Sequence, residues 1–205
     1  MASYSQRLLQ VIRSTNREIS LMEVCGTHTM AIARSGIREL LPPNIRLLSG
    51  PGCPVCVTSQ GDIDSVIEMV RREEVILLTF GDMMRVPGTR SSLQEERSRG
   101  ADVRVVYSPL EALKIAENNP DREVVFLGIG FETTVPTVAV TLEEAREAGL
   151  HNFSLFSLHK LVPPALELIM SDPEIRVDGL ICPGHVTAVT GLKHYEALAQ
   201  NYGKP

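Results

Sequence analysis

Six short apolar runs constrain the fold of this 205-residue chain more than any other feature. They recur at roughly regular intervals and lack the alternation of apolar and polar residues that marks a half-exposed strand. Runs of this kind are typical of parallel strands that are buried on both faces. The runs are Ile45–Ser49, Val75–Phe80, Val103–Ser108, Val124–Ile129, Phe153–Leu158 and Gly179–Cys182.

Amphipathic segments between these runs predict helices. Residues 62–74 carry apolar side chains at helical spacing, and residues 134–148 end at Gly149, a residue type that favours helix termination. The alternation of strands and helices predicts an α/β fold with right-handed crossovers. Further helices are expected at residues 1–20, 109–118, 163–170 and 186–200.

A turn-rich segment, Asn118-Asn119-Pro120-Asp121, separates the first three predicted strands from the last three. We therefore expect an α/β protein of two similar Rossmann-like βα halves with parallel sheets. The first would span residues 1–119, with a leading helix, and the second residues 120–205. The second half looks incomplete, because residues 202–205 lie where a turn would normally lead into another strand.

Composition narrows the class of protein. Hydrophobic residues make up 43% of the chain, which is enough for a sizeable core. The formal charge of −5 and the aromatic content of 4% argue against a nucleic-acid partner. No apolar run is long enough to cross a bilayer, and the first residues lack a signal peptide. We expect a cytoplasmic protein with no membrane partner, whose four cysteines are thiols or metal ligands rather than structural disulfides.

Reactive or glycine-rich turns follow five of the six predicted strands. In open parallel sheets, ligands bind beyond the carboxyl ends of the strands. We therefore expect one ligand-binding edge to which the successive turns all contribute. The residues expected there are Cys53, Cys56, Asp82, Gly130, Glu132, Thr133, His159, Cys182 and His185.

Two cysteine motifs leave several chemistries open. Cys53 and Cys56 form a C-x-x-C on a strand-to-helix turn, where a helix N-terminus lowers the pKa of a thiol. Cys25 and His28 stand three residues apart, so on a helix both can reach one metal, with zinc or iron suited to this pair. The alternatives are a thiol–disulfide oxidoreductase, a structural Cys₃His zinc module, and cysteines packed without function.

Several long segments of the chain resemble the HypD family of NiFe hydrogenase maturation proteins. The resemblance runs from about residue 20 through nearly the whole chain. The segments are MEVCGTHTMAIARSGIRELLP, LLSGPGCPVCVT, TFGDMMRVPG, ADVRVVYSPLEALKIA, GFETTVPT, HKLVPPA and CPGHV.

The resemblance implies a scaffold for building the Fe(CN)₂CO unit of the hydrogenase, with a redox role rather than stand-alone catalysis. Cys25 would be the thiolate ligand of the iron, His28 would support or ligate it, and Cys53 and Cys56 would form a redox-active pair nearby. The implied partners are the small chaperone HypC and the cyanide donor HypE.

The chain departs from the family in two respects. The family has a [4Fe–4S] cluster whose cysteines lie in a segment beyond residue 205, so this chain looks truncated or split. Ser59 also stands where family members usually have proline, from which we expect little consequence.

Overall fold

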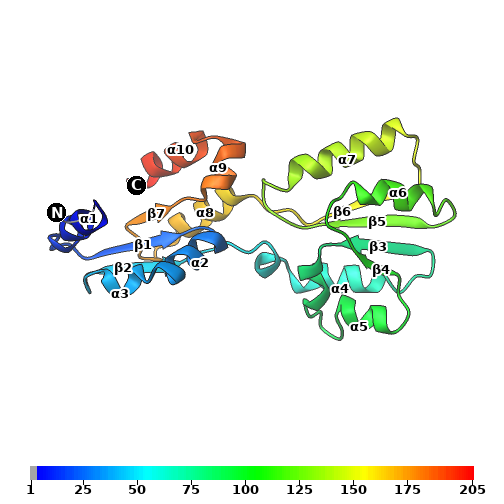
Figure 1. Cartoon of the computed structure of the whole chain (residues 1–205), viewed down its shortest axis with the longest axis horizontal. Helices are drawn as coiled ribbons and strands as arrows, with labels where there is room; N and C mark the ends of the chain where they lie inside the picture. Colours follow the sequence, from blue (N-terminus) through cyan, green and yellow to red (C-terminus); the bar gives the residue numbers. More distant parts are fainter. Residues whose placement is uncertain (1–3) are drawn as a thin grey trace. The chain divides into compact units, whose positions relative to one another are not determined.

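The computed structural model describes residues 4–205 and has an α/β fold with two parallel sheets (Figure 1). The chain divides into two compact units. One consists of Met1–Cys53 together with Leu161–Pro205, and the other consists of Pro54–Lys160. The predicted α/β class with parallel sheets is confirmed.

The discontinuous unit contains a three-stranded parallel sheet in the order β2-β1-β7. The central strand places Glu23 opposite both Ser49 and Ile181, so the three strands end at the same level. The elements are α1 (Tyr4–Arg13), β1 (Ile19–Glu23), α2 (Gly26–Ser35), α3 (Ile37–Leu40), β2 (Ile45–Ser49), α8 (Val162–Ser171), β7 (Gly179–Ile181), α9 (Gly184–Thr190) and α10 (Lys193–Tyr202).

The continuous unit contains a four-stranded parallel sheet in the order β4-β3-β5-β6. Ser59 caps α4 by accepting a hydrogen bond from the backbone N–H of Asp62, a contact that a proline at this position cannot make. The elements are η1 (Val55–Val57), α4 (Gln60–Met69), β3 (Val75–Thr79), η2 (Gly81–Arg85), α5 (Leu93–Ser98), β4 (Val103–Val105), α6 (Glu111–Glu117), β5 (Glu123–Gly128), α7 (Val135–Glu147) and β6 (Phe153–Ser157).

Both faces of this second sheet are covered, which explains why its strands are continuously apolar. Figure 1 shows α4 and α5 on one face and α6 and α7 on the other. Leu77 of β3 packs in the cluster that contains Ile63 and Val66 of α4. Its neighbour Leu78 packs in the opposite cluster, with Ala112 of α6. The alternation of side chains along a strand therefore serves two cores.

All six predicted strands are present, and β2 has the predicted bounds. The predicted leading helix is shorter than expected, since α1 ends at Arg13 and residues 19–23 form β1, which the sequence analysis missed. The helix predicted at residues 186–200 is two helices, because Gly191 adopts a φ of 78° that ends α9.

The structure divides the chain differently from the predicted boundary at residue 119/120. The turn at residues 118–121 lies within the continuous unit, between α6 and β5. β5 pairs with β3, and β7 returns to pair with β1. Turn composition reports a break between neighbouring elements, but it does not report which distant strand an element will join. No described helix has both the length and the apolar character needed to span a bilayer.

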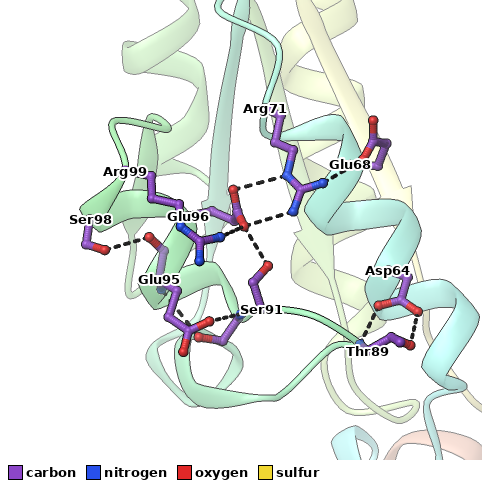
Figure 2. A network of polar contacts seen from close by, with 10 residues as sticks. Asp64, Glu68, Arg71, Thr89, Ser91, Glu95, Glu96, Ser98 and Arg99 are labelled. Carbon is purple, nitrogen blue, oxygen red and sulfur yellow. Dashed lines mark hydrogen bonds and ion pairs between the residues drawn. The ribbon is translucent and has the colours of Figure 1, made fainter.

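A network of ion pairs centred on Glu96 joins α4 to α5 in the continuous unit (Figure 2). The Glu96 carboxylate is 4% exposed and accepts hydrogen bonds from Arg71, Arg99 and Ser91. The bonds from Arg71 and then Ser91 lower the pKa of Glu96 from its ordinary value of 4.5 to about 2. The ionised carboxylate therefore stabilises the fold above pH 4.5, and this contribution is lost as the pH falls toward 2.

Glu96→Gln should lower the free energy of unfolding at pH 7 by on the order of 1–2 kcal/mol, because it removes charge-assisted bonds to half-exposed arginines. Urea unfolding at pH 7, 4 and 3 would measure this loss, which should shrink as the pH falls. The control is Glu68→Gln, which removes an exposed partner of Arg71 and should cost less than about 0.5 kcal/mol. Equal losses in the two variants would contradict the role of Glu96.

Candidate functional site

Cys25 and His185 form a thiol–imidazole pair at the carboxyl ends of β1 and β7. The Cys25 Sγ lies 3.7 Å from Nδ1 and 3.9 Å from Nε2 of His185, although 160 residues separate the two in sequence. The Val24 N–H donates to the Ile181 carbonyl at 3.0 Å and extends the pairing of these strands up to Cys25. The thiol is 7% exposed, whereas the imidazole is exposed. The pair is therefore open on its histidine side.

The glycine-rich loop after β2 packs directly on the backbone of Cys25. The Gly50 N–H donates to the Glu23 carbonyl at 2.8 Å. A β-carbon on Gly52 would lie 2.7 Å from the carbonyl carbon of Cys25, closer than real β-carbons approach, and would also clash with the Gly26 nitrogen. Only glycine permits this approach, which carries Cys53, the next residue, to the same edge of the sheet.

Cys182 follows β7 at this edge, three residues before His185. Burial raises the pKa of the Cys182 thiol, so this cysteine stays protonated at neutral pH. Because metals bind thiolates rather than thiols, this raised pKa makes Cys182 a poor candidate for a metal ligand.

His28 lies in the first turn of α2, which begins directly after Cys25. Its Nδ1 atom is enclosed and has no hydrogen-bond partner among the described residues. Buried ring nitrogens are normally hydrogen-bonded, and this one remains available to a polar ligand or a metal. The direct contact to the Cys25 thiol comes from His185, which lies 160 residues away. The pairing of Cys25 with His28 stays a prediction from their spacing.

Cys53 is half-buried and is the last residue of the first segment of the discontinuous unit, whereas Cys56 is exposed in η1 of the continuous unit. None of the four cysteines is in a disulfide. Within residues 4–205, no three or more His, Cys, Asp or Glu side chains form a group that could hold a metal. The Cys₃His zinc set of Cys25, His28, Cys53 and Cys56 is therefore not assembled in this structure.

The other predicted ligand-contacting residues follow strands of the second sheet. Asp82 follows β3, Gly130, Glu132 and Thr133 follow β5, and His159 follows β6. The prediction of one shared edge is therefore corrected to two edges, one on each sheet. The sequence could not reveal this division, because a β-strand looks the same whichever sheet it joins.

His159 lies against Gly128, where a β-carbon would come within 2.7 Å of the imidazole Cε1. Its Nδ1 is 2.9 Å from Ser157 Oγ, while Nε2 is enclosed without a partner among the described residues. Burial lowers the pKa of His159 below its ordinary 6.5, so the ring is neutral at pH 7. A neutral imidazole with one unused nitrogen is suited to hydrogen-bonding a polar ligand.

The remaining residues of this second edge differ in exposure. Glu132 is buried and Asp82 is exposed, with the Asp82 carboxylate accepting a bond from the Met83 N–H at 3.0 Å. Gly130 lies directly against Thr134, whose hydroxyl donates to the Phe131 carbonyl. Gly130 thus allows close packing of its turn, and the Asp82 carboxylate bonds to the backbone within η2.

Sequence reasoning did not single out Glu23, which ends β1 two residues before Cys25. Its side chain is 0% exposed, and its Oε1 accepts bonds from Ser49 and Arg38. The only signal in the sequence was a charged residue between apolar ones, Met22 and Val24.

Comparison with known proteins identifies the family. The HypD family, described as "Hydrogenase formation hypA family", matches residues 2–205. The chain belongs to the HypD family.

Individual HypD relatives match most of this chain but only part of their own length. The hydrogenase maturation factor HypD of Azotobacter vinelandii is 52% identical over 195 residues, covering 92% of this chain and 52% of that protein. HypD of Rhodobacter capsulatus is 48% identical over 196 residues, covering 96% and 52%, and HypD of Escherichia coli K12 is 46% identical over 200 residues, covering 98% and 54%. The chain thus spans about half the length of these relatives.

Gly52→Ala should displace the loop from Cys25, because the added methyl has no room beside the Cys25 backbone. We expect a loss of about 1–3 kcal/mol in the free energy of unfolding and faster alkylation of the Cys25 thiol. Gly184→Ala is the control, since nothing lies within 4 Å of a β-carbon there. Urea unfolding and mass-spectrometric mapping of alkylated Cys25 would measure both effects, and unchanged alkylation would contradict the packing of this loop.

His159 should titrate below pH 6.5 in the folded protein. The unfolded chain then takes up the proton first, so the contribution of His159 to stability is lost as the pH falls below 6.5. An NMR titration of the imidazole resonances, assigned with His159→Gln, would measure the midpoint. A midpoint at or above 6.5 would contradict the burial of this ring.

Proposed function

We propose that this chain is part of a NiFe hydrogenase maturation scaffold that holds iron on Cys25 while the Fe(CN)₂CO unit is assembled. The observation that supports this most strongly is the close approach of Cys25 and His185 at a glycine-lined sheet edge. Membership of the HypD family supports a role in hydrogenase maturation. The contact between Cys25 and His185 supports these two residues as the place where iron would be held.

The donor set suits iron as cargo. A soft thiolate and an imidazole are ligands that iron accepts, and two protein donors leave positions open for cyanide and CO. Cys25 lies directly before the ten-residue helix α2, just beyond the end of β1. His28 would support or complete the set through its unpartnered Nδ1. Gly50 and Gly52 let the backbone approach small ligands without side chains intervening.

The remaining assignments rest on the resemblance and stay with the proposal. Cys53 and Cys56 would form a redox-active thiol pair, supplied with electrons through a [4Fe–4S] cluster that lies outside this chain. The turns that follow the strands would contact ligands during assembly, as their position at the strand ends predicts, through Cys182, Asp82, Gly130, Glu132, Thr133 and His159. A HypC-like chaperone would receive the iron unit and a HypE-like protein would donate cyanide.

A thiol–disulfide oxidoreductase is the second candidate function. It is favoured by the C-x-x-C spacing of Cys53 and Cys56 and by the exposure of Cys56. This function requires Cys53 and Cys56 but not Cys25, so one variant separates the two proposals.

Anaerobic loading with ferrous iron, followed by desalting and metal analysis, tests the proposed scaffold. Cys25→Ala should abolish iron retention, and His185→Gln should weaken iron affinity by at least about tenfold. His194→Gln, which changes an exposed histidine on α10, is the matched control and should bind iron like the wild type. Undiminished iron in Cys25→Ala would overturn the proposal, and retained disulfide exchange in that variant would then favour the oxidoreductase.

A further inference from the structure

We propose that Glu23 is a positioning residue that holds the Cys25 and Cys53 loops in register at the sheet edge. The inference rests on the proposed function for its metal readout, but it also has a consequence that needs no metal.

Glu23 is a charged residue type at a fully buried position, which is rare in proteins. It is fully buried, and its Oε2 atom is enclosed without a hydrogen-bond partner among the described residues. An enclosed, unpaired carboxylate oxygen costs free energy of folding. An apolar residue of similar volume at such a place is often no less stabilising than the ionised side chain. Stability alone therefore gives no reason for a glutamate here.

The contacts of Glu23 connect three segments that surround Cys25. Glu23 and Ser49 are the final residues of β1 and β2 and lie directly opposite each other in the sheet. The Ser49 hydroxyl donates to Glu23 Oε1 at 2.7 Å, and Arg38 of α3 donates to the same oxygen at 3.3 Å. Arg38 also donates to Ser49 Oγ at 3.1 Å, which closes a three-membered ring of hydrogen bonds.

This ring lies at the base of both thiol-bearing loops. Cys25 follows Glu23 by two residues, and Cys53 follows Ser49 by four. The main chain of Glu23 adds a further link, because its carbonyl accepts the Gly50 N–H. Arg38 ties in α3, which directly follows the helix that begins after Cys25. Fixing the strand ends in this way fixes where the two loops meet at Gly52.

Replacing Glu23 should change the positions of the Cys25 and Cys53 loops without lowering the free energy of unfolding. Ser49 is exposed and the Arg38 side chain is 44% exposed, so water can satisfy both if the carboxylate is removed. Glu23→Met should therefore leave the free energy of unfolding unchanged or raise it, while the loops lose their shared anchor. Glu23→Gln and Ser49→Ala each keep part of the ring and should have smaller effects in the same direction.

The metal-free test is cross-linking of Cys25 to Cys53 with a short bifunctional thiol reagent, in a full chain that carries Cys56→Ser and Cys182→Ser. We expect Glu23→Met to slow cross-linking by about tenfold or more, a size typical of lost support around a site. Glu39→Gln, which changes an exposed carboxyl on α3, is the control and should cross-link like the parent.

The metal test is the thiolate-to-cobalt absorption band after addition of Co²⁺ to the full chain. It should weaken in Glu23→Met and stay unchanged in Glu39→Gln. If wild type gives no cobalt band but the cross-linking differences hold, the proposed function fails and the role of Glu23 stands. If Glu23→Met does not fold, Glu23→Gln and Ser49→Ala provide the comparison. Cross-linking at the parent rate in every folded Glu23 and Ser49 variant would overturn the role of Glu23.

Discussion

The pairing of β1 with strands from both ends of the chain is the constraint on which the candidate metal site depends. β1 has β2 on one side and β7 on the other, and all three run parallel. Their carboxyl ends therefore coincide, and each strand continues into a loop with a reactive side chain. The thiol of Cys25 and the imidazole of His185 meet because β1 and β7 are neighbours, not because their motifs are close in sequence.

Close backbone approach completes this arrangement. The loop after β2 touches the Cys25 main chain through Gly52, and Gly50 is held by the carbonyl of Glu23. Side chains at these glycines would push Cys53 away from Cys25. Hydrophobic burial stabilises the four-stranded sheet. At the carboxyl ends of β1 and β2, near Cys25 and Cys53, hydrogen bonds and close glycine contacts hold the loops in place. The polar network around Glu96 stabilises the second unit without contributing to either predicted site.

Much of the fold could be predicted from local patterns. The continuous apolar character of all six runs predicted strands buried on both faces. This holds for β3 and β5, whereas β2 and β6 are only partly buried. β1 escaped because Ser20 and Glu23 interrupt its apolar residues. The residues near Cys25 were predicted as candidates, but the contact of Cys25 with His185 was not, since the pairing of β7 with β1 is a long-range choice. His159 and Glu132 follow strands of the four-stranded sheet, and this placement also depends on long-range strand pairing that the local sequence does not reveal.

The most direct test of the scaffold proposal is anaerobic infrared spectroscopy of this chain after co-expression and purification with HypC-like and HypE-like partners, beside the Cys25→Ala variant. The proposal predicts cyanide and CO stretching bands in the wild type and their loss in the variant, with both proteins recovered folded. Bands of equal intensity in the two samples would contradict iron binding by Cys25, and their absence from both would contradict assembly of the iron unit on this chain.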